Sequence, residues 1–351
     1  MTATCVTLDC MIFGLQRFGG ISNYWTRLVA AEQQRWAGQC TLVMPATCTF
    51  IDMPALTSPV LQERWPNRFS RYMRAPLGNS DTVFHTSYYR LPARRPQRYV
   101  VTVYDFTYER YRTGLPRAVH RIQKERAIRA ADVVLCISQS TRDDLLRQMP
   151  EVSPEKLVVT PLAADPALFY PDSRPEQTSG APYVLFVGQR GGYKRFDLAV
   201  SALRSLPGLR LGIVGAPLSD VEHASLTEAL GDRWTVFANV DNARLRQLYS
   251  DAYAFLFPSD YEGFGLPLLE AMGCGCPVVA ANRSSFPEVV QSAGLLAETQ
   301  TSEEYAALLA TLSDNGVRAA LIADGYERMQ AYSWEKTMMQ TAAAYGLDVT
   351  G

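Results

Sequence analysis

The chain has 351 residues, which makes two domains the default expectation at about 150 residues per domain. Hydrophobic residues make up 47% and charged residues 20% of the sequence, and glycine and proline are at ordinary levels. These values exclude a disordered, collagen-like or disulfide-stapled protein. The formal net charge of −1 gives no sign of a nucleic-acid partner.

The neutral total is made of two halves of opposite charge. Residues 1–165 hold 21 Lys and Arg against 14 Asp and Glu, whereas residues 166–351 hold 13 against 21. A basic half beside an acidic half suggests different binding partners for the two, with chance asymmetry as the alternative.

The first residues, MTATCVTLDCMIFG, predict a strand rather than a signal peptide, because they lack a basic segment and Asp9 interrupts the apolar stretch. The longest apolar runs, such as 252–258, are far shorter than the about 18 residues that cross a bilayer. Seven scattered cysteines fit reduced thiols in a cytoplasmic protein. Cys274 and Cys276 lie far in sequence from any histidine, so a tight turn is preferred to a metal site.

In chain order, the first half alternates short β-branched stretches with longer amphipathic ones. The sequence predicts strands at 4–8, 41–44, 82–84, 100–103, 133–137 and 157–160, and helices at 21–36, 116–130 and 140–149. This rhythm is typical of parallel α/β units and predicts a first domain at 1–170. Residues 171–182 have no period and are rich in Pro, Ser and Gly, which predicts a linker.

After the linker the same rhythm restarts and predicts a second α/β domain at 183–330. Its expected strands are 183–187, 210–214, 234–237, 253–257 and 277–281, and its expected helices are 195–205, 220–230, 242–250 and 265–272. A last helix within 331–351, capped by Ser333, is expected to pack back across the domains. Two tandem Rossmann-like domains with parallel sheets would bind ligands in the cleft that the strand ends face.

The most informative motif follows the expected strand 253–257 and reads Glu262-Gly-Phe-Gly-Leu-Pro-Leu-Leu-Glu270. Its glycines let backbone N–H groups approach a ligand, and the helix start that follows favours phosphate. Glu270, about one turn inside that helix, can accept hydrogen bonds from a ribose diol. Glu262, on the loop, can hold sugar hydroxyls.

A second motif, Gly188-Gln-Arg-Gly-Gly-Tyr-Lys-Arg195, follows the first strand of the second domain. It departs from a P-loop, because Tyr193 precedes Lys194 and no Ser or Thr follows, so an ATPase is not expected. Arg190 and Lys194 on a glycine-flanked turn suit a diphosphate instead.

These motifs resemble the family 4 retaining glycosyltransferases of the GT-B fold. The resemblance rests on the Glu262-x7-Glu270 signature and extends, in the expected order, to Phe18-Gly-Gly-Ile-Ser-Asn23, Val187–Phe196, Ser284-Ser-Phe-Pro-Glu-Val289 and Tyr332-Ser-Trp-Glu335. It implies an acceptor site on the first domain and a nucleotide-sugar site on the second. It also implies metal-independent transfer with retained anomeric configuration and no cofactor besides the nucleotide-sugar donor.

The resemblance also implies individual roles. Arg190 and Lys194 would hold the donor diphosphate and stabilise it as it leaves, although this chain has Gln189 where much of the family has arginine. The donor-binding set carried over is Gly19, Gly20, Arg190, Lys194, Gly263, Phe264, Gly265, Leu266 and Glu270, with Glu262 at the sugar. The Gly-Tyr-Lys-Arg-Phe variant is similar to bacterial mannosyl- and rhamnosyltransferases of surface polysaccharides, which implies GDP-mannose or a related donor and a glycan or lipid-linked glycan acceptor.

Two polar residues follow strands of the first domain. Asp105 is expected at the acceptor side, as a hydroxyl contact or weak base, with a cap of the next turn as an equal alternative. Many relatives have histidine where Tyr104 stands, so that histidine's role does not carry over. His85 also ends a strand, and a structural histidine is favoured there over an acceptor contact.

Residues 63–98 contain eight arginines against Glu63 and Asp81, with Trp65, Phe69 and Tyr72 interleaved. Arginines beside aromatic residues suit an anionic membrane surface or a phosphate-linked lipid acceptor, and a solvated helix face is the alternative. The residues expected to meet the inner face of the membrane are Arg64, Arg68, Arg71 and Arg74. No nucleic-acid motif supports a different anionic partner.

Two other functions stay open at this stage: a GT-B-fold sugar-nucleotide epimerase and a noncatalytic sugar-nucleotide-binding protein. Glu262, Glu270, Arg190 and Lys194 together disfavour the noncatalytic protein, because binding alone does not need leaving-group stabilisation.

Overall fold

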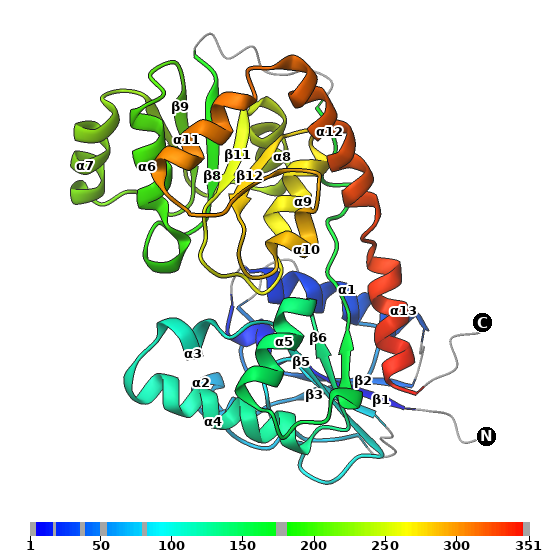
Figure 1. Ribbon diagram of the computed structural model, residues 1–351. Coiled ribbons are helices and arrows are strands. Elements are labelled where there is room, and N and C mark those ends of the chain that lie inside the picture. Colours follow the sequence, from blue (N-terminus) through cyan, green and yellow to red (C-terminus); the bar gives the residue numbers. More distant parts are fainter. Residues whose placement is uncertain are drawn as a thin grey trace. The chain divides into compact units, whose positions relative to one another are not determined.

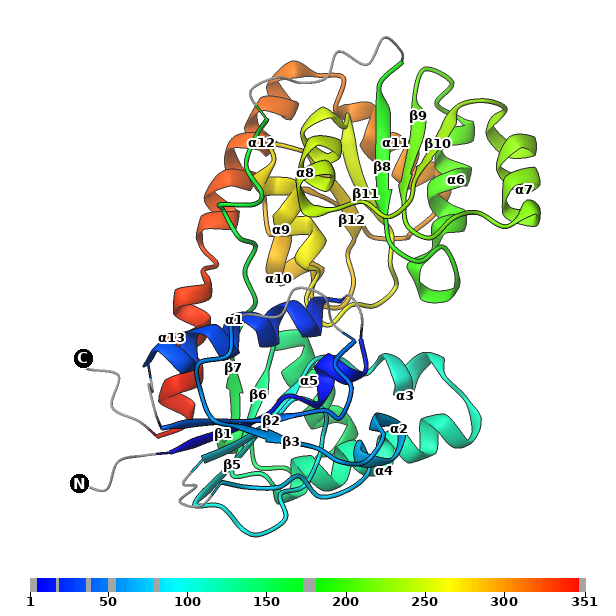
Figure 2. The same ribbon diagram turned by 180° about the vertical axis from the view of Figure 1, so that it is seen from behind.

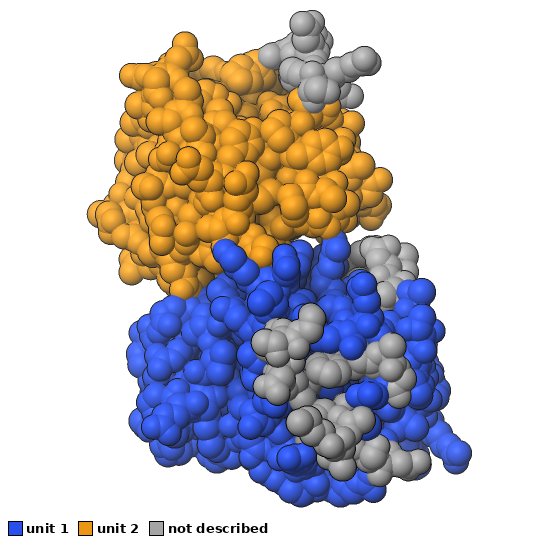
Figure 3. Space-filling view, turned by 90° about the vertical axis from the view of Figure 1, so that its right-hand side faces the viewer, with its two compact units in different colours: residues 1–162, 334–351 blue, residues 163–333 orange. Residues whose placement is uncertain are grey.

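The computed structural model describes residues 5–16, 19–35, 39–49, 55–78, 83–172 and 181–346. The chain divides into two compact units, unit 1 with residues 1–162 and 334–351, and unit 2 with residues 163–333 (Figure 3). Each unit is built on one parallel sheet, so the predicted α/β class with two Rossmann-like domains is confirmed. Residues 173–180 of the predicted linker lie outside the described residues.

The sheet of unit 1 has seven strands in the order β3-β2-β1-β4-β5-β6-β7, and every neighbouring pair is parallel. Its central strands are buried along their whole length, which is why they read as apolar runs without alternation. The strands are β1 (Val6–Asp9), β2 (Cys40–Met44), β3 (Val60–Gln62), β4 (Val83–Thr86), β5 (Arg98–Val103), β6 (Val133–Cys136) and β7 (Leu157–Val159).

The helices of unit 1 include the last helix of the chain. Helix α13 packs against α1, where the rings of Tyr24 and Trp334 stack with centroids 6.2 Å apart. The helices are α1 (Gly20–Arg35), α2 (Asn67–Ser70), α3 (Thr107–Tyr111), α4 (Gly114–Ala130), α5 (Gln139–Gln148) and α13 (Trp334–Ala344), with 3-10 turns η1 (Met11–Gly14) and η2 (Pro154–Lys156).

The sheet of unit 2 has six parallel strands in the order β10-β9-β8-β11-β12-β13. This is the strand order of a dinucleotide-type Rossmann sheet. The strands are β8 (Tyr183–Val187), β9 (Arg210–Val214), β10 (Trp234–Phe237), β11 (Ala254–Phe257), β12 (Val278–Ala281) and β13 (Leu295–Ala297).

Helices cover both faces of the unit 2 sheet (Figures 1 and 2). Helices α6, α7 and α11 pack together as one layer, and α8, α9, α10 and α12 form the other. The helices are α6 (Phe196–Arg204), α7 (Asp220–Leu230), α8 (Asn242–Asp251), α9 (Leu266–Gly273), α10 (Phe286–Val290), α11 (Ser302–Thr311) and α12 (Asn315–Gln330), with the 3-10 turn η3 (Gly192–Lys194).

Each sheet has one position where the order of strand addition reverses, between β1 and β4 in unit 1 and between β8 and β11 in unit 2. Open α/β sheets bind ligands outside the carboxyl ends of their strands at this switch point. The loops that leave β8 and β11 carry the two motifs singled out in the sequence. Across the described ranges, no helix is both long and apolar enough to cross a membrane.

Candidate active site

The loop after β8 is held against its neighbours by backbone contacts. Gly188 N–H donates to the Val214 carbonyl at 2.9 Å, and the chain then turns through η3 to Lys194. Arg195 ends the turn in the left-handed region, with φ 49°. The Tyr193 carbonyl accepts from Asp260 N–H at 2.8 Å, so this loop is tied to the loop after β11.

The loop after β11 is fixed by hydroxyls from the start of the next β-α connection. Ser285 Oγ donates to the carbonyls of Glu262 and Phe264, at 3.0 and 2.8 Å. Gly265 takes φ 95° at the start of α9, and a Cβ there would lie 3.0 Å from both Leu268 and Phe286. Glycine is therefore required by conformation and by space at this position.

These two loops bring Lys194 and Glu262 into contact. Lys194 Nζ forms an ion pair with Glu262 Oε1, and 15% and 18% of the two side chains are exposed. The ammonium also lies 5.1 Å from the ring centroid of Phe257, the last residue of β11. A cation and a carboxylate that are 68 residues apart in sequence thus meet at the switch point of unit 2, where both can still reach a ligand.

Glu270 lies on α9 and is half-buried. Tyr249 Oη donates to its Oε2 at 3.5 Å. Burial raises the pKa of Glu270 to about 7, and the Tyr249 hydrogen bond lowers it by less. A ligand that donates hydrogen bonds to this carboxylate would stabilise its ionised form.

The other residues predicted to bind the donor in this region lie on the loop after β11 and at the start of α9. Gly263 and Phe264 are buried, and the Phe264 ring packs edge-on against Tyr332 with centroids 5.5 Å apart. Leu266, the first residue of α9, is half-buried. The start of α9 therefore rests on a closely packed loop.

Arg190 is bound within unit 2. Its Nε donates to Glu222 Oε1 at 2.7 Å, and its two terminal nitrogens donate to the carbonyls of Ala216 and Pro217 at 2.7 and 3.0 Å. Hydrogen bonds from Arg190 and from the backbone and side chain of Ser219 lower the pKa of Glu222 to about 2. To bind a diphosphate, the Arg190 guanidinium would have to leave these partners. Lys194 already lies where the loops after β8 and β11 meet, beside Glu262. The role of Arg190 stays a prediction.

In unit 1, Gly19 and Gly20 lie at the start of α1, and Phe18 of the same motif lies outside the described residues. Gly19 has φ 158°, and a Cβ there would come within 2.7 Å of Gln16 Oε1. Gly20 is exposed, with no atom within 4 Å of the place a Cβ would take. The Gly20 backbone is thus open to close approach, as the prediction for this loop requires.

Asp105 lies just after β5. Its Oδ1 accepts from Thr107 N–H at 2.8 Å, which is the turn-capping contact that the sequence left open, and the carboxylate remains half-buried. The buried Lys124 ammonium donates to the Asp105 carbonyl and lies 3.4 Å from Glu109 Oε2. Burial lowers the pKa of Lys124. Sequence reasoning did not single out Lys124, whose contacts depend on the packing of α4 against α3.

His85 is a structural histidine, as favoured. It is fully buried, and its two ring nitrogens lie 2.8 Å from Tyr345 Oη and 2.7 Å from Thr102 Oγ1. Burial lowers its pKa to about 3, so the ring stays neutral.

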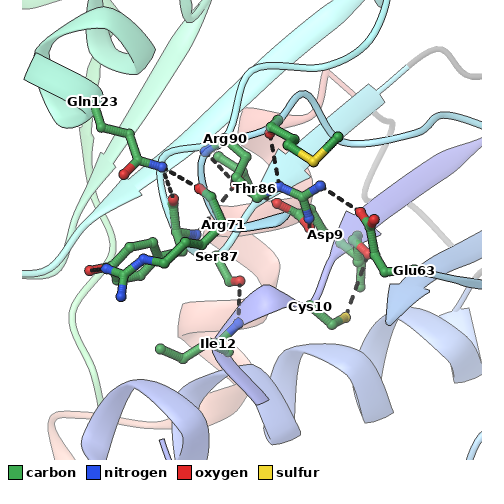
Figure 4. Close-up of polar contacts among 12 residues, drawn as sticks. Asp9, Cys10, Ile12, Glu63, Arg71, Thr86, Ser87, Arg90 and Gln123 are labelled. Atoms are coloured by element: carbon green, nitrogen blue, oxygen red, sulfur yellow. Dashed lines mark hydrogen bonds and ion pairs between the residues drawn. The ribbon is translucent and has the colours of Figure 1, made fainter. Parts of the chain in front are cut away.

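The switch point of unit 1 is filled by a buried ion network that the sequence did not reveal (Figure 4). Arg90 donates to Asp9 Oδ1 at 2.8 Å and to Glu63 Oε1 at 2.5 Å. Thr86 Oγ1 donates to Asp9 Oδ2 at 2.8 Å. Arg90 and Asp9 have fully buried side chains, and burial raises the pKa of Asp9 although Arg90 lowers it. The partners lie 27 and 81 residues from Arg90, so no local pattern could have identified them.

The arginines of segment 63–98 therefore have different roles. Arg90 is buried, while Arg64, Arg68 and Arg74 are exposed. Arg71 is half-buried and lies over the rings of Tyr72 and Tyr88, 5.1 and 4.6 Å from their centroids. The aromatic residues predicted to accompany them are exposed, with Trp65 at 58%, Phe69 at 52% and Tyr72 at 55%.

No group of three or more His, Cys, Asp or Glu side chains suited to a metal ion occurs in the described part of the chain. Cys274 and Cys276 are buried beside the C-terminal end of α9 and have free thiols.

Comparison with known proteins identifies the family. Residues 18–168 match Glycosyltransferase Family 4, and residues 172–328 match Glycosyl transferases group 1. The chain is 30% identical over 291 residues to O-antigen chain mannosyltransferase B of Escherichia coli, which covers 76% of this chain and 74% of that protein.

Solved structures agree in fold. Sucrose-phosphate synthase from Thermosynechococcus elongatus matches with a TM-score of 0.76 at 22% identity, over 98% of each chain. HepE of Anabaena, solved in complex with UDP, matches with a TM-score of 0.75 at 16% identity, over 98% of this chain and 99% of that one. The chain is a glycosyltransferase and belongs to family 4, with the GT-B fold.

Proposed function

We propose that this glycosyltransferase moves a hexose, mannose or a related sugar, from a nucleoside-diphosphate sugar to a glycan or lipid-linked glycan in surface polysaccharide synthesis. The O-antigen mannosyltransferase relative supports mannose and a polysaccharide product. The similarity of the Gly-Tyr-Lys-Arg-Phe segment to mannosyltransferases supports GDP-mannose as the donor. The UDP complex of HepE makes a UDP-sugar the second candidate.

The contact between Lys194 and Glu262 carries this proposal. A sugar diphosphate presents two demands to a protein: compensation of phosphate charge and orientation of hydroxyls on the sugar. The pair offers one group for each demand, at the ends of two loops that meet at a switch point. Glu270 supplies an acceptor for the ribose diol, and the N–H groups at the start of α9 favour the diphosphate.

In the proposed reaction the sugar bond to the diphosphate breaks while an acceptor hydroxyl attacks on the same face. Negative charge grows on the diphosphate, and Lys194, released from Glu262, stabilises it. The departing diphosphate takes the acceptor proton, and Glu262 orients the sugar. The anomeric configuration is retained without a covalent intermediate, because Glu270 is committed to ribose and Glu262 to hydroxyls. The step uses no metal ion.

The other predicted residues take supporting parts in this proposal. Arg190 would exchange Glu222 and its two carbonyls for phosphate oxygens. Gly19 and Gly20 would let the start of α1 approach the donor. Asp105 would contact the acceptor hydroxyl.

We also propose that the protein is cytoplasmic and binds the inner face of the membrane through Arg64, Arg68, Arg71 and Arg74. Exposed arginines beside exposed Trp65, Phe69 and Tyr72 support this, because such side chains favour an anionic interface.

A panel of labelled GDP- and UDP-sugars tests the donor. We expect slow hydrolysis of GDP-mannose to GDP and mannose in the absence of an acceptor. Nucleotide release with an epimerised sugar would instead indicate an epimerase. Binding of every donor without turnover would indicate a noncatalytic sugar-nucleotide-binding protein.

A further inference from the structure

Unit 1 contains a pocket of about 380 Å³ that none of the donor residues lines. It lies between helix α4 and the segments 72–74 and 89–91, and is called the α4 groove below. Its volume is within the about 300–1,000 Å³ typical of small-molecule sites.

One wall of the α4 groove is a stripe along α4. Val119, Ile122, Gln123 and Arg126 are spaced at i, i+3, i+4 and i+7, so they share one face of the helix. This face is apolar for its first turn and ends in a cation, yet Ile122 remains 57% exposed. The helix thus presents an apolar stripe that the described part of unit 1 does not cover.

The opposite wall is held rigidly by hydrogen bonds. Gln123 Nε2 donates to the Arg71 carbonyl at 2.6 Å, and Arg90 Nε donates to the Met73 carbonyl at 3.2 Å (Figure 4). Arg74 Nη1 donates to the Pro92 carbonyl at 2.9 Å, and Ala75 N–H donates to the Leu91 carbonyl at 2.9 Å. The buried network around Arg90 therefore fixes the segment that faces α4, and the groove is formed before any ligand binds.

The charge of the groove is cationic. Arg74 and Arg126 both line it and both are exposed, and neither forms an ion pair with a described acidic residue. Glu125, the one acidic residue within Gly114–Ala130, is paired with Arg121 and Arg129 at 2.6 and 2.9 Å. Two guanidinium groups that have no carboxylate partner among the described residues, beside apolar side chains, fit a ligand with an anionic head and an apolar chain.

We propose that the α4 groove binds one molecule of an anionic lipid. Arg74 and Arg126 contact its phosphate, and its chain lies along Met73, Val119 and Ile122. Charge complementarity selects this occupant, because guanidinium groups form two parallel hydrogen bonds with phosphate oxygens and the apolar stripe gains from covering a chain. The proposal rests on the proposed function in that it places a membrane phospholipid in a defined pocket rather than on a diffuse surface.

Calorimetry with dihexanoyl phosphatidylglycerol below its micelle concentration tests the groove. Because the probe is monomeric, it separates a single-lipid pocket from attraction to a charged surface. We expect saturable one-to-one binding. Inorganic phosphate and dihexanoyl phosphatidylcholine should bind at least about tenfold more weakly, because each lacks one of the two features recognised.

Two matched pairs of variants locate the site. The double variant R74A/R126A should weaken lipid binding by about tenfold to a hundredfold, as expected for loss of charge-assisted contacts. The double variant R121A/R129A removes the same charge from the same helix outside the groove and should leave affinity within about twofold. Ile122→Ser should weaken binding about three- to tenfold. Leu115→Ser, an exposed apolar position on α4 outside the groove, should not.

Three results would overturn the proposal: no binding of the monomeric lipid, equal weakening by both arginine pairs, or inorganic phosphate binding as tightly as the lipid. Hydrolysis of GDP-mannose by the parent protein is measured in parallel. Hydrolysis without lipid binding would refute the groove alone, and lipid binding without hydrolysis would refute GDP-mannose as the donor alone.

Discussion

The two units place ion pairs at corresponding strand ends and expose them differently. In unit 2, Lys194 and Glu262 keep 15% and 18% of their side chains exposed. In unit 1, Arg90 and Asp9 are fully buried, and Glu63 and Thr86 complete their hydrogen bonds. A partly exposed pair can exchange one partner for a ligand, whereas a buried pair cannot without leaving an uncompensated charge.

The same topology therefore places a candidate reactive site at the switch point of unit 2 and a buried structural ion network at that of unit 1. Arg90 ties Glu63 and Met73 to the ends of β1 and β4. Residues 63–74 carry the exposed Arg64, Arg68 and Arg74, and residues 72–74 form part of one wall of the α4 groove. The binding surfaces proposed for unit 1 thus lie on loops and on α4, while the candidate binding residues of unit 2 lie at its switch point.

The largest effect is expected from breaking the buried network. Arg90→Ala should destabilise the protein by about 3–5 kcal/mol, because Asp9 would remain as an unpaired buried charge. Chemical unfolding followed by tryptophan fluorescence measures this loss. Arg95→Ala, which breaks an exposed pair with Asp132 in the same unit, is the control and should cost about 0–1 kcal/mol. Similar losses of stability in both variants would contradict the structural role assigned to the buried Arg90 network.

Lys194→Ala should lower kcat about 10²–10³-fold, because one fixed cation no longer acts on the charge that grows on the leaving diphosphate. Stability should change little, since the pair it breaks is partly exposed. Steady-state kinetics with GDP-mannose give kcat and KM separately, and Lys336→Ala, an exposed lysine on α13, controls for loss of a positive charge. A rise in KM with unchanged kcat would make Lys194 a uniform binder instead.

Glu270→Gln should weaken binding of GDP by about 1.5–3 kcal/mol at pH 8. Burial raises the pKa of this carboxyl to about 7 in the free protein, and a ribose diol favours the ionised form. Affinity of the parent for GDP should therefore rise as pH increases from 6 to 8, beyond any rise that the variant shows. Calorimetry at several pH values measures both profiles. Parallel profiles would refute the ribose assignment.

Glu270 also links stability to pH. Since its pKa is raised above the unfolded value near 4.5, its effect on stability is absent below pH 4.5. The parent should lose stability as pH rises from about 4.5 to 7, on the order of 1–3 kcal/mol. Glu270→Gln should lack this loss, so the unfolding free energies of the two proteins should diverge across that window.

The smallest effect concerns the membrane surface. Reversal of Arg64 and Arg68 to Glu should reduce sedimentation with phosphatidylglycerol vesicles, at about 1 kcal/mol for each basic residue near the surface. Arg71 is not used, because it packs over Tyr72 and Tyr88. Reversal of Arg204 and Arg210, which lie in unit 2, is the control. Equal sedimentation of the parent and both variants would indicate a solvated face around α2.

Much of the fold could be predicted because buried parallel strands and amphipathic helices have local patterns. The predicted strands at 183–187, 210–214 and 234–237 have the bounds observed, and helix 220–230 does too. Strands β3 and β13 were missed, since each has only three residues and lacks the adjacent valines that mark the equally short β7. Helices α11 and α12 were also missed, which places more of unit 2 in helix than the sequence analysis expected.

For the candidate site too, the positions of the motifs could be predicted from the sequence, but the contacts between their side chains could not. The two glycine-containing motifs lie next to strands, so their place at the end of β8 and β11 could be predicted. The contact of Lys194 with Glu262 spans 68 residues, and that of Arg90 with Asp9 spans 81. Such contacts depend on which strands become neighbours, and they leave no signal in either local stretch of sequence.

In the proposed reaction the protein cleaves a nucleoside-diphosphate mannose with retention of configuration. Proton NMR of GDP-mannose incubated with the parent protein tests it most directly, because the anomeric signals of the first mannose released report its configuration before mutarotation. We expect α-mannose first, together with GDP, and no signal above background with Lys194→Ala on the same time scale. Release of β-mannose first, or no turnover of any GDP- or UDP-sugar, would contradict it.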